Sequence, residues 1–250
     1  MNIDSAHQFA CYHASLSSIL SRKIIGQTIQ LEDPTLAHRI YTILRMEAGD
    51  AITLFDCTHH IVLELHKQPN KKSIAGIVRQ QERNVPLSPE ILILLPVLKR
   101  DALQDALYTC VELGATTIQL VLTTKTHAIR YDATMAQRLQ AIAVSAAEQS
   151  KQFIIPTILS PIPLSQAIEQ LPAHTNTLCF HPNGQSITSI FTNLNRSNPI
   201  TITFGPEGDF TETETVMLQN SSFQFYRLTP TVLRSQQALT VALGIVRSIV

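Results

Sequence analysis

The 250-residue sequence contains no tryptophan, and only 15% of its residues are charged. Basic and acidic side chains are equal in number, 19 of each, so the formal net charge is zero. A nucleic-acid partner would therefore have to be held by a local basic strip rather than by the total charge. Because 44% of the residues are hydrophobic, the composition is also far from that of disordered chains.

Long apolar runs are absent as well. No stretch approaches the roughly 20 apolar residues of a membrane helix. The first 20 residues lack a basic start and a continuous apolar segment, so they do not read as a signal peptide or an anchor. We therefore expect a protein without membrane attachment, located in the cytoplasm.

The four cysteines, Cys11, Cys57, Cys110 and Cys179, are widely separated and form no Cys-x-x-Cys pair. This usage predicts reduced, structural cysteines and no metal site. Cys57 precedes His59 and His60, but the segment 56–59 is typical of a polar hairpin turn rather than a metal centre. The motifs of dinucleotide binding, nucleoside-triphosphate binding, serine hydrolysis and zinc proteolysis are also missing.

The N-terminal part is predicted to be β-rich. Strand-like alternation covers 26–31, 51–55, 61–66 and 73–78, and helical spacing covers 36–46. The character changes at the Pro-containing stretch 80–89, where we place the domain boundary. The expected domains are residues 1–79 and 80–250.

After this boundary, strands and helices alternate. Strands are expected at 91–95, 117–122, 154–159, 177–180, 200–204 and 223–228, and helices at 101–113 and 133–150. This order predicts an α/β fold with a parallel sheet, and a ligand crevice beyond the carboxyl ends of its strands.

The most informative segment is residues 199–214, in which a β-branched strand is followed by Gly205-Pro206-Glu207-Gly208 and by a helix start. Two glycines permit positive φ or close backbone approach. Thr211 and Glu214 have the spacing of a capping box. The segment fits an ordinary strand–turn–helix connection or a ligand-binding loop.

A second motif follows at 227–238, Arg-Leu-Thr-Pro-Thr-Val-Leu-Arg-Ser-Gln-Gln-Ala. A Gly-Pro-Glu-Gly loop followed by Leu-x-Pro-x-Val-Leu-Arg resembles the SPOUT class of methyltransferases, and within it the RsmE family, ribosomal RNA small subunit methyltransferase E. Segments 36–50, 112–114 and 148–156 fall in the same family order. The resemblance covers nearly the whole chain.

The chain also departs from the family pattern. Asp209 stands where a second glycine is usual, and Thr229, Thr231 and Gln236 replace a glycine, an arginine and a glutamate. Lys125 matches a family arginine, whereas Thr109 and Gln152 replace basic residues. Most of these losses remove positive charge, which bears on RNA affinity more than on fold.

The resemblance implies a PUA-like, RNA-binding domain followed by a SPOUT domain with a trefoil knot. It implies that S-adenosylmethionine (SAM) binds to three late loops, with Leu228 and Leu233 as an apolar wall for adenine. The segment 181–184 fits a plain turn equally well. The candidate cofactor-binding residues are His181, Pro182, Gly184, Phe204, Gly205, Pro206, Gly208, Leu228, Thr229, Val232 and Leu233.

The implied reaction is methylation of N3 of a uridine in 16S ribosomal RNA. Arg234 is the candidate that stabilises the uridine anion, with packing or capping of the last helix as the alternative. Glu207 is the second catalytic candidate, positioning cofactor or base. Gln236 can form hydrogen bonds but cannot accept a proton. The RNA-binding candidates are Arg22, Lys23, Arg39, Arg45 and Lys125.

The C-terminal segment 232–250 is apolar almost all round, which predicts a homodimer through the knot region. The expected partner is 16S ribosomal RNA or the 30S subunit. Two other functions stay open: an RNA-binding or assembly protein that retains the fold without catalysis, and a SPOUT enzyme for another RNA.

Overall fold

The computed structural model describes residues 9–20, 24–126 and 130–250. The chain divides into two compact units, residues 1–85 with 147–154, and residues 86–146 with 155–250. The expected boundary after residue 79 falls inside a strand that continues to Arg83, so the division comes later. None of the described helices has both the length and the apolar character needed to cross a membrane.

The first unit is built on a five-stranded sheet in the order β1-β3-β4-β5-β2, with β1 parallel to β3 and the other pairs antiparallel. The predicted helix over 36–46 begins earlier, at Pro34, where Asp33 caps it, and ends as a π-helical turn. The elements are β1 (Ala10–Tyr12), α1 (Leu16–Ile19), β2 (Thr28–Glu32), α2 (Pro34–His38), the π-helical turn (Arg39–Ile43), β3 (Ala51–Phe55), β4 (His59–Leu65) and β5 (Ser73–Arg83).

The second unit contains a six-stranded sheet in the order β11-β9-β10-β6-β7-β8, and every neighbouring pair is parallel. The predicted α/β alternation is therefore confirmed. The elements are β6 (Ile91–Pro96), α3 (Arg100–Glu112), β7 (Thr117–Leu122), α4 (Ala133–Ser150), β8 (Thr157–Pro163), α5 (Leu164–Glu169), β9 (Asn176–Ser186), a 3₁₀ turn (Ile187–Ser189), α6 (Ile190–Asn193), β10 (Ile200–Phe204), α7 (Glu212–Asn220), β11 (Gln224–Arg227) and α8 (Ser235–Ile249).

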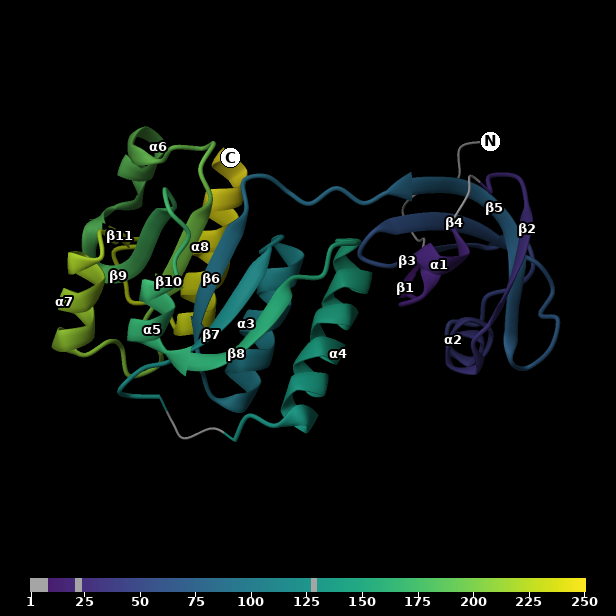
Figure 1. Ribbon diagram of the computed structural model, residues 1–250, viewed down its shortest axis with the longest axis horizontal. Helices are drawn as coiled ribbons and strands as arrows, with labels where there is room; N and C mark the ends of the chain where they lie inside the picture. The colour runs from purple at the N-terminus through teal and green to yellow at the C-terminus, as the bar shows by residue number, and fades with distance from the viewer. Residues whose placement is uncertain (1–8, 21–23, 127–129) are drawn as a thin grey trace. The chain divides into compact units, whose positions relative to one another are not determined.

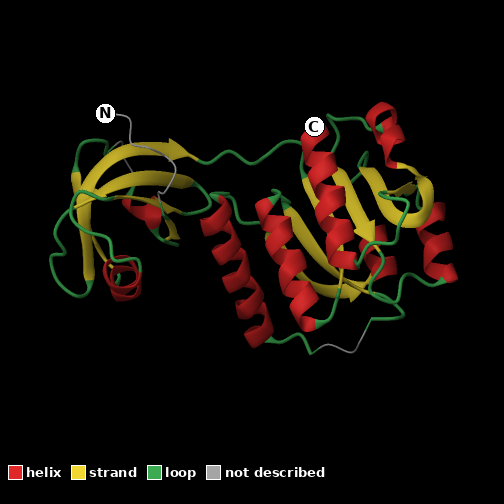
Figure 2. Cartoon of the chain, turned by 180° about the vertical axis from the view of Figure 1, so that it is seen from behind, coloured by secondary structure: helices red, strands yellow, loops and turns green. Residues whose placement is uncertain are grey.

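Both faces of this sheet are covered by helices, as Figures 1 and 2 show from opposite sides. Ile91, Ile93 and Leu95 of β6 pack with buried residues of α3 and α8. Leu94 faces the other way and packs with residues of α5 and α7. A strand buried on both faces is an uninterrupted apolar run, which is what residues 91–95 contain.

Candidate active site

A pocket of about 420 Å³ lies at the carboxyl ends of the parallel strands in the second unit. The segments that line it follow β6, β10 and β11, and β9 contributes residues 180–182. This is the place where open α/β sheets bind ligands. The lining residues are Lys99, Ala102, Phe180, His181, Pro182, Phe204, Gly205, Pro206, Glu207, Asp209, Arg227, Leu228, Thr229, Thr231, Val232, Leu233, Arg234, Ser235, Gln236 and Ala238.

The segment 181–184 lies within β9 rather than in a turn between elements. β11 pairs with β9 at Cys179 and again at Gln185, so residues 180–184 form an irregularity in the β11 register. Gly184 lies against β11, because a Cβ atom there would come within 2.5 Å of the Tyr226 nitrogen. Gly184 does not line the pocket, and its lack of a side chain is explained by this close passage of two backbones.

The loop after β10 is shaped by Asp209, which has a φ of +58°. Non-glycine residues seldom adopt this left-handed conformation, but aspartate is among those that tolerate it best. The Asp209 side chain folds back over Gly205, where a Cβ atom would collide with its Oδ1. Gly205 is thus required by the loop itself.

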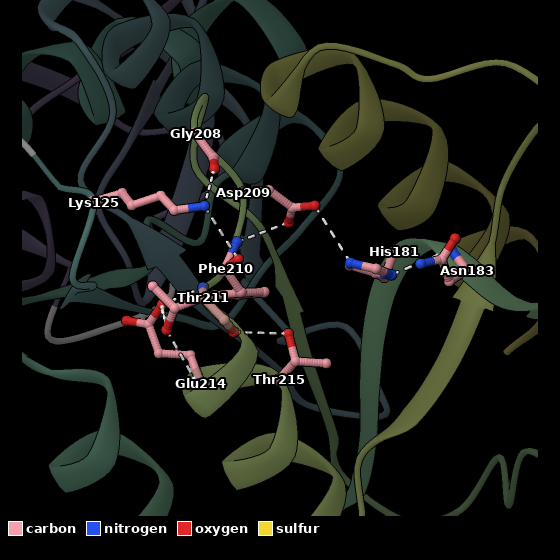
Figure 3. A network of polar contacts seen from close by, with 9 residues as sticks. All are labelled: Lys125, His181, Asn183, Gly208, Asp209, Phe210, Thr211, Glu214 and Thr215. Atoms are coloured by element: carbon pink, nitrogen blue, oxygen red, sulfur yellow. Dashed lines mark hydrogen bonds and ion pairs between the residues drawn. The ribbon is translucent and has the colours of Figure 1, made fainter.

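Lys125 comes from the connection after β7 and holds the same loop from the other side. Its Nζ donates a hydrogen bond to the Gly208 carbonyl at 2.7 Å, and the Phe210 carbonyl lies 3.4 Å away (Figure 3). A Cβ atom on Gly208 would lie 3.1 Å from Cδ of the Lys125 side chain. Gly208 does not line the pocket.

The predicted capping box at the start of α7 is present, and it extends to a second loop. Glu214 Oε2 accepts the Thr211 N–H and hydroxyl, while Oε1 accepts the N–H and hydroxyl of Thr124. Burial alone would raise the pKa of Glu214, but these four hydrogen bonds hold it below its ordinary value. The carboxylate therefore joins the β7 and β10 loops beside the pocket.

Glu207, a predicted catalytic residue, lines the pocket and is exposed. Its Oε1 accepts the backbone N–H of Lys99 at 2.9 Å. Lys99 is the residue before α3, and its own side chain does not cap the helix. A carboxylate at the positive end of a helix is stabilised there. Glu207 thus connects the β10 loop to the start of α3.

Three cationic side chains line the pocket: Lys99, Arg227 and Arg234. Arg234 is the residue before α8, and its side chain makes no capping hydrogen bond. Arg227 ends β11, and all three residues are exposed. Within the described part of the chain, their side-chain nitrogens form no hydrogen bond or ion pair. The net charge of the whole chain is zero, but these three side chains give the pocket positive groups that are free to bind an anion.

The structure brings most of the predicted site residues to this one pocket. Of the predicted catalytic and cofactor residues, those that line it are His181, Pro182, Phe204, Gly205, Pro206, Glu207, Leu228, Thr229, Val232, Leu233 and Arg234, whereas Gly184 and Gly208 do not. Lys125 holds the β10 loop instead of lining the pocket. Arg22 and Lys23 lie outside the described residues.

The two remaining RNA-binding candidates lie in the first unit. Arg39 forms a bidentate ion pair with Glu148, with nitrogen–oxygen distances of 2.8 and 2.5 Å, and Glu148 also accepts the Tyr12 N–H. The Glu148 side chain is only 3% exposed. The hydrogen bonds to Glu148 raise the pKa of Arg39. Arg45 is exposed and has a φ of +54°.

Sequence reasoning did not select Lys99, Arg227 and Asp209 as site residues. Lys99 ends the connection from β6 to α3, and Arg227 is the last residue of β11. Both positions lie on the carboxyl side of the parallel sheet, where ligands bind, and this is the signal that sequence reasoning could have used. Asp209 was noted as a departure from the glycine that is usual in the resembled family, but its partner, 28 residues earlier in the chain, is a matter of tertiary structure.

The fold and this carboxyl-edge pocket are those of a parallel-sheet α/β protein with a ligand site built from late loops. Residues 85–247 match the family model of the RNA methyltransferase domain. The chain belongs to this family, and the match confirms the resemblance seen in the sequence.

Similar proteins extend the comparison to nearly the full chain. Ribosomal RNA small subunit methyltransferase E of Synechocystis sp. is 27% identical over 90% of this chain and 75% of its own length. The protein of the same name from Rickettsia conorii is 26% identical, covering 92% of this chain and 93% of its own. A crystal structure of the Neisseria gonorrhoeae enzyme bound to S-adenosyl methionine has a TM-score of 0.81 and 26% identity, covering 97% and 98% of the two chains.

Proposed function

We propose that this chain transfers a methyl group from SAM to N3 of a uridine in the 16S ribosomal RNA of the small subunit. The observation that carries this proposal is the pocket at the carboxyl edge, because the two sequence motifs in 199–214 and 227–238 converge on it. The SAM-bound relative with the same fold supports the choice of cofactor.

The residues of the pocket fit a ligand of this kind. Its volume of about 420 Å³ lies within the range of small-molecule sites. Phe180, Phe204, Leu228 and Leu233 provide apolar surface suited to a purine ring, and the loops contribute backbone polar groups. When bound, SAM supplies an electrophilic methyl group.

Arg234 has the chemistry needed for the nucleophile. N3 of uridine is a weak acid that must lose its proton before or during attack, so negative charge develops on the base. A guanidinium with no partner among the described residues is free to stabilise that charge. Arg234 is the residue we assign to this role. Holding the base and the methyl group in line provides much of the remaining acceleration.

Glu207 is better suited to positioning than to proton transfer. One of its oxygens accepts the Lys99 N–H, which keeps the β10 loop beside α3. Gln236 lines the same pocket and can orient a base through its amide. The group that accepts the N3 proton is not assigned to either residue.

Arg227 and Lys99 are proposed to contact RNA phosphates next to the target uridine. Both are exposed, both line the pocket, and phosphate contacts of this type position a nucleic acid without reading its sequence. The first unit is proposed to be a PUA-like domain that holds RNA farther from the target, with Arg45 and the Arg22–Lys23 pair as its cationic candidates.

The proposal includes a trefoil knot in the second unit and a homodimer through its C-terminal region. Val241, Ile245 and Ile249 of α8 are half-buried, whereas Leu239, Leu243 and Val246 are buried. A partner would cover the half-buried side. A monomer mass by light scattering at micromolar concentration would contradict the dimer. A cytoplasmic location is expected because the proposed substrate is the ribosomal small subunit.

The function is tested by transfer of a radiolabelled methyl group from SAM to 30S subunits that lack the modification, followed by mapping of the methylated nucleotide. We expect one uridine in 16S RNA to be labelled at N3. Cofactor binding without transfer to any RNA would favour a non-catalytic binding protein. Transfer to a different RNA would favour a SPOUT enzyme of other specificity.

A further inference from the structure

A contact between two side chains joins two segments that line the pocket. His181 Nε2 lies 3.3 Å from Asp209 Oδ2, and Figure 3 shows the two side chains reaching toward each other from β9 and from the loop after β10. The His181 side chain is 13% exposed, whereas that of Asp209 is 47% exposed. The acid is therefore the member of the pair that a ligand can reach more easily.

The hydrogen bonds around His181 determine which nitrogen carries the proton in the neutral ring. The backbone N–H of Asn183 donates to Nδ1 at 3.2 Å, so Nδ1 is an acceptor. Nε2 then bears the hydrogen and donates it to Asp209. The ring is also held by an edge contact with Phe225, at a centroid distance of 5.9 Å. His181 thus presents one fixed donor to the carboxylate.

Asp209 is held on its other side as well. Its Oδ1 accepts the Phe210 N–H at 2.8 Å and lies over Gly205. Each carboxylate oxygen has used one of its two acceptor positions, and the residue lines the pocket. An acidic group that is half exposed and fixed in two places is preorganised to accept hydrogen bonds from a ligand.

We propose that Asp209 is a cofactor-binding residue that accepts a hydrogen bond from a hydroxyl or ammonium group of SAM, and that His181 is the positioning residue that orients its carboxylate. This inference rests on the proposed function, because it takes SAM as the occupant of the pocket. The two segments follow paired residues of neighbouring strands, Phe180 of β9 and Phe204 of β10, and the His181–Asp209 contact continues this connection beyond the strand ends. It gives the carboxylate a fixed position in the pocket lining.

The test uses substitutions that are compatible with the backbone conformation at residue 209. Asparagine and glycine both tolerate a φ of +58°, so Asp209→Asn and Asp209→Gly remove the charge without new strain. We expect each to weaken SAM binding about 10-fold or more in calorimetry, the scale of a lost charged hydrogen bond. Melting temperatures of the apo proteins should stay close to wild type. Asp105→Asn, an equal charge change on the exposed side of α3, is the control.

His181 is tested through a double-mutant cycle. Phenylalanine keeps the ring packing against Phe225 but removes both nitrogens. If His181 acts through the carboxylate, His181→Phe should weaken SAM binding in the wild type and have little further effect in the Asp209→Asn background. Equal losses in both backgrounds would overturn the positioning role, since a purely structural effect does not depend on the acid.

S-adenosylhomocysteine separates the possible contacts, because it keeps the hydroxyl and ammonium groups of SAM and lacks the sulfonium. We expect the same loss of affinity for both ligands. A loss restricted to SAM would overturn the assigned contact. Unchanged affinities in both Asp209 variants, with a wild type that binds SAM, would overturn this inference alone. A wild type that does not bind SAM at millimolar concentration would overturn the proposed function with it.

Discussion

Arg39 in the first unit and the two arginines of the pocket in the second unit have opposite surroundings. In the first unit, Arg39 is bound by both oxygens of the buried Glu148. In the second, Arg234 and Arg227 line a pocket and have no side-chain partner among the described residues. Charge alone does not distinguish these three side chains as contacts for an RNA or its reacting base. The presence or absence of a carboxylate partner separates an arginine that builds a domain from one that can meet a substrate.

The largest effect is expected from removing the unpaired guanidinium of Arg234 at the pocket. Arg234→Ala should lower methyl transfer roughly 100-fold or more, the effect of losing one preorganised anion-stabilising group. SAM affinity and melting temperature should be nearly unchanged, because the side chain caps nothing in α8. Methyl transfer to unmethylated 30S subunits, measured beside calorimetry, gives both quantities.

Arg234→Lys refines this test, since lysine keeps the charge but loses the planar fork. Recovery of most of the activity would mean that charge alone suffices. An Arg234→Ala protein whose activity falls only as far as its folded fraction would show that the arginine is structural.

The opposite experiment removes the paired guanidinium of the first unit. Arg39→Ala should destabilise that unit by about 2 kcal/mol, less than the 3–5 kcal/mol of a fully buried pair because Arg39 keeps contact with solvent. The loss arises because the buried Glu148 carboxylate would keep, among the described residues, just the hydrogen bond from the Tyr12 N–H. Urea unfolding measures it.

Arg45→Gln is the matched control in the same unit, because Arg45 is exposed. We expect Arg45→Gln to change the stability of the first unit very little. If Arg39→Ala left the stability intact and lowered RNA affinity instead, Arg39 would be an RNA contact despite its partner.

Glu214, which joins the β7 and β10 loops, should contribute to stability in a pH-dependent way. Glu214→Gln is expected to cost about 1.5–2 kcal/mol at neutral pH, because the amide cannot accept all four hydrogen bonds. The pKa of Glu214 is lowered in the folded protein, so its contribution is full above the ordinary carboxyl pKa of about 4.3 and is lost as the pH falls through the folded value.

The difference in stability between wild type and Glu214→Gln should therefore shrink below about pH 4 in chemical unfolding experiments. Glu212→Gln, an exposed acid in the same helical turn, is the control and should show a small effect. A gap that stayed constant down to pH 3 would mean that the cost comes from packing rather than from charge.

The smallest expected effect concerns Arg227. If it contacts a phosphate, Arg227→Ala should weaken RNA binding several-fold without altering SAM affinity, and the slope of log K against log salt should fall by about one. Arg196→Ala, exposed and outside the pocket, should leave the slope unchanged. An unchanged slope for Arg227→Ala would contradict the phosphate contact.

Local patterns predicted much of the second unit. The strands at 117–122 and 200–204 and the helix at 133–150 have the bounds expected from periodicity and flanking residues. The capping box of Thr211 and Glu214 could also be predicted from the sequence, since all of its parts lie within four residues. Such features depend on neighbours in the chain and need no knowledge of the fold.

The sequence by itself determined that this is an α/β protein with a β-rich first part, and it identified the loops that converge on a carboxyl-edge pocket. Tertiary structure alone decided that Gly184 lies against β11, that Lys125 lies beside Gly208, that Glu148 holds Arg39, and that His181 meets Asp209. These contacts join residues that are distant in the chain. Periodicity reports only which face of an element is apolar, and a side chain's partner across space is determined by how the elements pack.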